Sequence, residues 1–177
     1  MSSPQYDVVL YGATGFTGGL TAQYLATHPQ QPRVAFAGRN RSKLEKVRQG
    51  LTKVSKERME SIGLIEASAS DKASLTRMAQ SAKVVMNLVG PYSQLGGKDV
   101  AQAAVEAGAG YVDLTGETGY YAELVEQLHG PAQKNHSILL PSVGFDSMPF
   151  DLGAYLAVQE VKKVAGPKAQ VELALSL

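Results

Sequence analysis

Three glycines, Gly12, Gly15 and Gly18, carry the strongest chemical signal in this sequence. They follow the apolar run VVL and lead into a helical stretch, within the segment VVLYGATGFTG of residues 8–18. The first glycine permits a sharp turn, the second lets backbone approach a pyrophosphate, and the third lets a helix lie close to a strand. The free amides and the positive dipole end of such a helix favour phosphate binding. We therefore predict a dinucleotide site, with a G-x-x-G-x-x-G variant of the usual G-x-G-x-x-G spacing. The alternative is a turn that only packs a strand against a helix.

The cations after the next apolar run bear on which dinucleotide is bound. That run ends at Gly38, about twenty residues beyond Gly18, where the adenosine ribose of a bound dinucleotide is expected. An NAD site has a carboxylate there, whereas this sequence has Arg39, Asn40, Arg41, Ser42 and Lys43. A guanidinium binds the oxygens of a ribose 2′-phosphate through paired, charge-assisted hydrogen bonds. We therefore predict NADP(H) rather than NAD(H); the alternative is that these cations form a solvated helix start.

The residues that we expect to contact the cofactor come from the glycine turn, from the cationic segment and from the ends of two later strands. They are Gly12, Thr14, Gly15, Phe16, Thr17, Gly18, Arg39, Asn40, Arg41, Ser68, Val89, Gly90 and Pro91.

Three loops that follow predicted strands contain candidates for proton transfer. They hold Tyr92, Glu117 and Asp146, and ligands of open α/β sheets bind at the ends of the strands that precede such loops. Each side chain could donate a proton while the cofactor supplies a hydride. Each also has a structural alternative: Tyr92 as a packed loop aromatic, Glu117 as an acceptor for loop amides, and Asp146 as a helix cap. The catalytic residues therefore stay unassigned, with these three as candidates.

Several other chemistries lack the residues they need. None of the 8 tyrosines is followed four residues later by a lysine, which short-chain dehydrogenases require to lower the pKa of their tyrosine. The histidines, His28, His129 and His136, lack the spacing of metal ligands, so we expect no metal site. The sequence contains no cysteine, which excludes disulfides and thiol catalysis.

Length, charge and hydropathy favour an ordinary soluble protein. With 177 residues and 44% hydrophobic residues, the chain can build one good core. A formal net charge of +1 without a basic stripe makes nucleic acid an unexpected partner. The N-terminus lacks the pattern of a secretory signal, and no apolar run has the roughly eighteen residues of a transmembrane segment. We expect a soluble intracellular protein and leave peripheral membrane attachment open.

The elements that must position these residues alternate between strand and helix. Such alternation predicts an α/β fold: a doubly wound parallel sheet of six to seven strands in the order 3-2-1-4-5-6, with helices on both faces. Gly130 and Pro131 should break or kink the helix that contains them, and the proline in the sixth strand places that strand near an edge. The predicted strands are residues 8–10, 33–38, 62–67, 83–89, 111–117, 137–143 and 170–177, and the predicted helices are 16–27, 42–55, 71–82, 98–107, 120–135 and 150–164.

The last predicted strand suggests how the chain is divided into domains. Val171, Leu173, Leu175 and Leu177 alternate along it and form one apolar face, and nothing follows that could cover that face. We expect residues 1–150 to be an NADP-binding domain and residues 151–177 to begin a second domain that is mostly missing, for substrate or for oligomerisation. The strand could instead join the sheet as a seventh member, or pair across a homodimer.

Five segments in order, GATGFTG, AGRNRSKL, NLVGPYSQLGG, YVDLTGE and GFDSMPFDLGA, give the sequence a family resemblance. From Tyr6 to about Leu156 it resembles the saccharopine dehydrogenase-like oxidoreductases, a group similar to the trans-acting enoyl reductases. The resemblance implies a Rossmann domain, followed by a mixed α/β domain that completes the active site, and a reductase-like activity. It departs at Ser68, where family members often have an acid; Ser68 or Ser70 could replace that acid by hydrogen bonding.

Two functions follow from these observations. The first is the cofactor domain of an NADP-dependent oxidoreductase that reduces a carbonyl, an imine or an enoyl group of a small-molecule or lipid-like substrate. This piece alone is expected to bind cofactor without turnover. The second is a non-catalytic NADP(H)-binding sensor or interaction module, because no autonomous acid is evident in the sequence.

Overall fold

Runs of small and β-branched apolar residues form the strands of a parallel sheet whose central strands are covered on both faces. In this computed structural model, which describes residues 3–166, the sheet has six strands in the order β3-β2-β1-β4-β5-β6. The order confirms the predicted doubly wound fold and places its switch point between β1 and β4. The strands are β1 (Tyr6–Tyr11), β2 (Val34–Gly38), β3 (Gly63–Glu66), β4 (Ala82–Asn87), β5 (Gly110–Asp113) and β6 (Leu139–Leu140).

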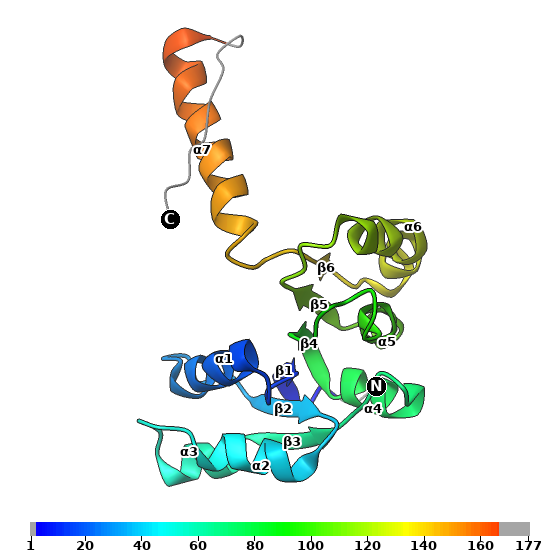
Figure 1. Cartoon of the computed structure of the whole chain (residues 1–177). Coiled ribbons are helices and arrows are strands. Elements are labelled where there is room, and N and C mark those ends of the chain that lie inside the picture. Colours follow the sequence, from blue (N-terminus) through cyan, green and yellow to red (C-terminus); the bar gives the residue numbers. More distant parts are fainter. Residues whose placement is uncertain (1–2, 167–177) are drawn as a thin grey trace.

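The helices cover both faces of the sheet, and each face has its own apolar core (Figure 1). On one face lie α1 (Phe16–Thr27), α2 (Arg41–Gln49) and α3 (Lys56–Ser61), which pack on Leu10, Val34 and Phe36. On the other lie α4 (Lys72–Gln80), α5 (Gly97–Glu106) and α6 (Thr118–Asn135), which pack on Val9, Val85 and Tyr111. The carboxyl ends of all six strands therefore meet at one edge, between the two helical layers.

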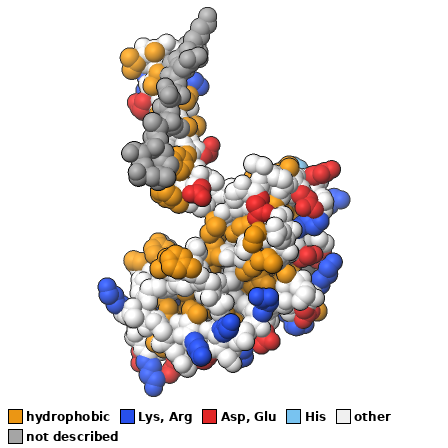
Figure 2. Space-filling model, viewed as in Figure 1, with side chains coloured by type: hydrophobic (Ala, Val, Ile, Leu, Met, Phe, Trp, Pro, Cys, Tyr) orange, Lys and Arg blue, Asp and Glu red, His pale blue; other side chains and the backbone are white. Residues whose placement is uncertain are grey.

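The helix α7 (Met148–Ala165) leaves the sheet and projects away from it (Figure 1). None of its residues is buried, and Leu152, Tyr155 and Leu156 are about half exposed or more. A second exposed apolar stripe, Phe16, Leu20 and Tyr24, runs along α1. Hydrophobic side chains accordingly appear both along α7 and on the domain surface below it (Figure 2).

The helix predicted over residues 42–55 is two helices in the structure. The first, α2, ends at Gln49, where Gly50 forms the C-cap, and Lys53 then adopts a φ of 57°. Ser55 begins α3 by accepting a hydrogen bond from the amide of Arg58 at 3.1 Å. Gly50 and Ser55 thus divide one stretch of helical apolar spacing into two helices. The spacing alone does not indicate this division.

The predicted break at Gly130 and Pro131 does not occur, because α6 runs as one helix from Thr118 to Asn135. Pro131 is exposed, while Leu128 and Ala132 on either side of it are buried against the sheet. This packing keeps the helix continuous through Pro131 despite the missing amide hydrogen.

The sixth strand is shorter than predicted but lies where expected. Only Leu139 and Leu140 pair with β5, and Pro141 follows directly, at the edge of the sheet. The strand predicted over residues 170–177 lies outside the residues that the structure describes. Among residues 3–166, no helix has both the length and the apolar character that crossing a bilayer requires.

Candidate functional site

The turn between β1 and α1 is shaped by its glycines. Gly12 has a φ of 93°, and a Cβ there would come within 2.7 Å of Val89 Cγ2. A Cβ on Gly18 would overlap the carbonyl oxygen of Gly12, so only glycine lets α1 lie this close to the turn. Gly15 is the N-cap of α1 and offers no side chain to bind the first amides of the helix. Those amides are therefore open to a ligand, as a diphosphate requires.

A groove of about 220 Å³ lies along this turn. It brings the glycine turn together with the ends of β2 and β4, so its walls come from three neighbouring strands at the switch point. Its lining residues are Tyr11, Gly12, Thr14, Gly15, Gly38, Arg39, Leu88, Val89 and Gly90.

A second cavity, of about 340 Å³, adjoins the first and shares Tyr11, Arg39 and Val89 with it. Its hydroxyl groups come from the loop after β3, where Ser68 Oγ and Ser70 Oγ lie 2.8 Å apart. Burial raises the pKa of Tyr11, which therefore stays a neutral hydroxyl at physiological pH. The remaining lining residues are Ala69, Gln94, Leu95 and Gly96. The two cavities together extend from the glycine turn across β2 and β3, the side on which a dinucleotide places its adenosine.

The cations of the segment after β2 differ in what they contact. Arg41 donates from Nη1 to the carbonyl oxygen of Leu64 at 3.2 Å, and Asn40 Oδ1 accepts from the amide of Lys43 at 2.9 Å as the N-cap of α2. Arg39 lines both cavities and, within residues 3–166, makes no hydrogen bond or ion pair. Of the two arginines in this segment, Arg39 is therefore the one that lines the cavities with its guanidinium available to an anionic ligand.

The other residues expected at the cofactor lie around the same turn. Phe16 and Thr17 are exposed at the start of α1, with Phe16 87% exposed, and Gly18 is buried beneath them. Pro91 is exposed and follows Gly90, which lines the groove.

Tyr92 and Glu117 meet in the loops after β4 and β5. The hydroxyl of Tyr92 donates to the backbone oxygen of Asn87 at 3.0 Å, and burial raises the pKa of Tyr92 to about 12. The carboxylate of Glu117 accepts from the amides of Tyr92 at 2.6 Å and Ser93 at 3.1 Å, and from the Ser93 hydroxyl. These hydrogen bonds lower the pKa of Glu117. Tyr92 is thus a packed loop aromatic, and Glu117 is an acceptor for loop amides, as in the structural alternatives to proton transfer.

Within the described residues, Asp146 makes no hydrogen bond to Tyr92 or Glu117. It is exposed, and Ser147 rather than Asp146 is the N-cap of α7, without a side-chain hydrogen bond. The structure therefore shows a contact between Tyr92 and Glu117, and none of Asp146 with either of them among residues 3–166.

A buried polar cluster beneath these loops was not evident from the sequence. Asp113, only 1% exposed, accepts from the Tyr111 hydroxyl at 2.9 Å and from the amides of Thr115 and Ser142 at 3.0 and 2.9 Å. The Tyr111 hydroxyl also receives a hydrogen bond from Asn87 Nδ2 and lies 3.0 Å from that of Tyr120. Burial raises the pKa values of both tyrosines. A polar residue at the last position of an apolar strand, as with Asn87 and Asp113, is the signal that could have revealed the cluster.

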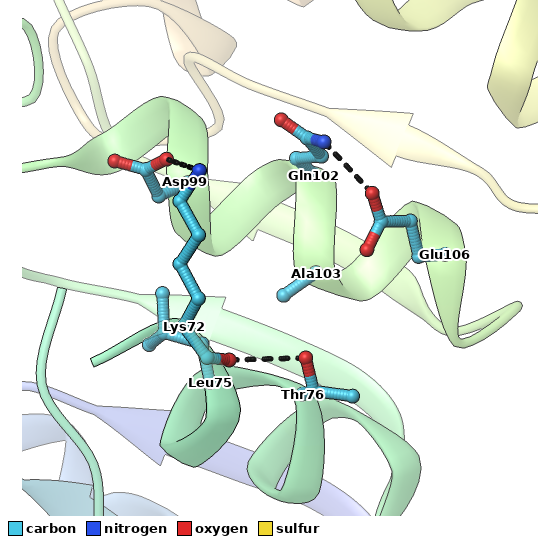
Figure 3. A pocket seen from close by; sticks show the side chains of 7 residues that line it. All are labelled: Lys72, Leu75, Thr76, Asp99, Gln102, Ala103 and Glu106. Atoms are coloured by element: carbon cyan, nitrogen blue, oxygen red, sulfur yellow. Dashed lines mark hydrogen bonds and ion pairs between the residues drawn. The ribbon is translucent and has the colours of Figure 1, made fainter. Parts of the chain in front are cut away.

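A polar groove between α4 and α5 does not belong to this site (Figure 3). Its charges are already paired: Lys72 Nζ lies 4.0 Å from Asp99 Oδ1, and Gln102 donates to Glu106 at 2.7 Å. It shares no lining residue with the cavities around the glycine turn. The candidate site is therefore the pair of cavities at the carboxyl edge of the sheet.

Comparison with known sequences agrees with this site. The family model of the saccharopine dehydrogenase NADP-binding domain matches residues 8–140. A trans-acting enoyl reductase of Mycobacterium tuberculosis is 38% identical over 172 residues, which cover 97% of this chain and 40% of that protein. A lipid droplet localized protein of Caenorhabditis elegans is 38% identical over 151 residues, 84% of this chain and 35% of that protein. The chain thus spans well under half the length of these relatives.

Solved structures share the fold. Apo saccharopine dehydrogenase (L-Glu forming) of Saccharomyces cerevisiae matches with a TM-score of 0.70 and 19% identity, over 89% of this chain and 32% of that one. Triphenylmethane reductase of Citrobacter sp., solved with NADP(H), matches with a TM-score of 0.54 and 16% identity, over 75% of this chain and 48% of that one.

Proposed function

The chain belongs to the family of saccharopine dehydrogenase NADP-binding domains, and from this premise we propose that it is the cofactor domain of an oxidoreductase that reduces a carbonyl, an imine or an activated double bond. The domain binds NADP(H), and the bound cofactor supplies the hydride. The residues of this chain bind the cofactor, orient it and shape the strand edge over which it lies. Reduction of a double bond is the favoured case, since relatives 38 to 40% identical are named enoyl reductases.

The observation that carries this proposal is the glycine turn with Arg39 beside it. The open amides of α1 would hold the diphosphate, next to the groove lined by Gly12, Thr14 and Gly15. Val89 and Gly90 also line that groove. The adjoining cavity, with Ser68 and Ser70, would take the adenosine.

Arg39 is the residue that would hold the ribose 2′-phosphate. It lines both cavities, whereas the neighbouring Arg41 and Asn40 already bind backbone groups within the domain. A guanidinium can bind two phosphate oxygens at once, so Arg39 would make the chain prefer NADPH over NADH. Arg41 and Asn40 would act indirectly, by fixing the turn that carries Arg39.

Titration of the chain with NADPH and NADH tests this assignment. Arg39→Ala should weaken NADPH binding about 10- to 100-fold, the range of one lost charge-assisted, bidentate contact. NADH binding should change less than about twofold, because NADH lacks the phosphate that Arg39 binds. The dissociation constants can be measured from the fluorescence of the reduced nicotinamide.

Arg41→Ala is the matched control, with a smaller effect on both nucleotides. Equal affinity of the unmodified chain for NADH and NADPH would contradict the role of Arg39. Binding of neither nucleotide would overturn the proposed function itself.

We also propose that residues 1–150 form the NADP-binding domain and that residues from 151 onward begin a second domain. The exposed apolar face of α7 and the greater length of the relatives support this division. The substrate would lie between the two parts and be lipid-like, in keeping with the exposed Phe16 and Leu20 beside the cofactor turn. NADPH consumption with enoyl and keto substrates of increasing chain length, measured with the longer protein, tests this.

The cofactor and the exposed apolar residues also bear on the location and the oligomeric state of the protein. We propose an intracellular protein, where NADPH is available, with peripheral attachment to a lipid surface like that implied by the name of the nematode relative.

A homodimer would bury the apolar groove between α6 and β6, which contains Val125, Leu128 and Ile138. Val125→Lys should then shift a dimer to monomer in light scattering.

The second candidate function, a sensor of NADP(H) without turnover, is favoured by one observation. Tyr92 and Glu117 are both committed to backbone groups, so neither offers a free proton at the strand edge. A longer protein that binds NADPH but oxidises it with none of the substrates in such a panel would be a sensor.

A further inference from the structure

Glu117 joins two loops at the carboxyl edge of the sheet. It follows β5 and is the N-cap of α6, while its hydrogen-bond partners, Tyr92 and Ser93, belong to the loop between β4 and α5. One carboxylate oxygen, Oε1, accepts from the Tyr92 amide, and the other, Oε2, accepts from the amide and hydroxyl of Ser93. Both oxygens are therefore occupied by donors from one loop.

Glu117 is itself held in place. Its amide donates to Thr115 Oγ1 at 3.1 Å, and Thr115 is 1% exposed. The amide of Thr115 donates in turn to the buried carboxylate of Asp113 at 3.0 Å. The position of Glu117 is thus fixed by the end of β5, and the carboxylate transmits that position to the neighbouring loop.

The loop that Glu117 binds forms walls of both cavities. Val89 and Gly90, on one side of Tyr92 and Ser93, line the groove along the glycine turn. Gln94, Leu95 and Gly96, on the other side, line the adjoining cavity. Moving the two residues held by Glu117 would therefore move walls of both cavities.

We propose that Glu117 is a positioning residue for cofactor binding, a carboxylate clamp that holds the loop of residues 89–96 in the shape that NADP(H) requires. This inference rests on the proposed function and assigns Glu117 a role other than proton donor. The clamp acts on the loop and not on the ribose 2′-phosphate, which Arg39 would bind from β2. Loss of the clamp should thus weaken NADPH and NADH alike.

Nucleotide titrations of Glu117 variants test the clamp. Glu117→Ala removes both acceptors and should weaken NADPH and NADH binding by the same factor, about tenfold, because the binding-competent loop becomes a minor population. Glu117→Gln keeps one acceptor oxygen and should give a smaller loss, about threefold. Ser93→Ala, at an exposed position, removes one donor and should give a loss of about twofold.

Coupling between the two positions separates a clamp from a general effect on folding. In the Glu117→Ala background, Ser93→Ala should have no further effect on NADPH binding, since its partner is gone. Glu126→Gln, an exposed change on the same helix, is the control and should bind like the unmodified chain. Circular dichroism establishes that each variant is folded at the temperature of the titration.

Three outcomes would overturn the clamp. One is folded Glu117→Gln and Ser93→Ala variants that bind NADPH as tightly as the unmodified chain. Another is a loss confined to NADPH, which would place Glu117 at the phosphate, and the third is full additivity of the two substitutions. If the unmodified chain bound neither nucleotide, the proposed function and the clamp would fail together, a result distinct from all three.

Discussion

The two adjacent glycines of α1 differ in what a methyl group would meet. At Gly18 a Cβ would overlap the carbonyl oxygen of Gly12, a backbone atom that cannot turn aside, whereas at Gly19 nothing lies within 4 Å. Gly18→Ala should therefore lower the free energy of unfolding by about 1–3 kcal/mol and weaken NADPH binding as the turn shifts. Gly19→Ala, the matched control, should raise the free energy of unfolding by about 0.5–1 kcal/mol, as expected for alanine in place of glycine in a helix. Urea denaturation measures both, and equal effects of the two changes would contradict the close packing at Gly18.

At the same scale, some site residues could be predicted from the sequence and others could not. Gly12 and Gly18 could, because the turn demands backbone without a side chain, and only glycine supplies it. The different contacts of Arg39 and Arg41 could not, because the direction of a side chain in a turn depends on neighbours such as Leu64. The acceptors for the Tyr92 and Ser93 amides were foreseen only as an alternative, since Glu117 lies more than twenty residues away in the chain.

At the scale of elements, one carboxylate ties together the beginnings of three strands. Asp7 in β1 accepts from the Arg33 side chain at 2.9 Å and lies 2.9 Å from Lys83 Nζ, at the starts of β2 and β4. Hydrogen bonds from Arg33 and Lys83 hold the pKa of Asp7 well below its ordinary value of 3.8. The stabilisation is thus fully present above about pH 4 and is lost as the pH falls through the lower, folded-state pKa.

Asp7→Asn should therefore lower the free energy of unfolding at neutral pH, and the difference from the unmodified chain should shrink toward about pH 2. Denaturant titrations across this range measure it, with Glu126→Gln as a control without such partners. A difference that stayed constant down to the acid limit would show that the charge of Asp7 contributes nothing.

The ends of helices could be predicted from capping residues only where no second cap or tertiary packing altered the helix. The predicted helix over residues 71–82 begins within one residue of that range, because the Asp71 side chain caps α4 by accepting from the Ser74 amide in the same turn. The split between α2 and α3 depends on Gly50 and Ser55 acting within one apolar period, and the unbroken α6 depends on burial around Pro131. Tertiary packing keeps α6 continuous, and the periodicity of the sequence carries no information about that packing.

At the scale of the whole molecule, the order of the strands was accessible because parallel connections are right-handed and short. The surface that α7 packs against could not be predicted from the sequence. The pattern of an amphipathic helix indicates which face is apolar, but it does not indicate what covers that face. In the structure this helix lies outside both apolar cores, beyond the edge strand β6. The fold that binds the cofactor should therefore be independent of α7.

A chain that ends at Ser147 tests this independence. It keeps Ser142 and Val143, whose amides bind Asp113 at 2.9 Å each. Of the residues that the structure describes, it loses α7, which has no buried residue, and Gly166. Its free energy of unfolding should stay within about 1 kcal/mol of that of the 177-residue chain, since little apolar surface leaves the cores. NADPH affinity should change less than about twofold, and saturating NADPH, at about a hundred times its dissociation constant, should stabilise both chains by about 2.7 kcal/mol. A shortened chain that folds but no longer binds NADPH would place part of the cofactor site on α7 and move the proposed domain boundary beyond it.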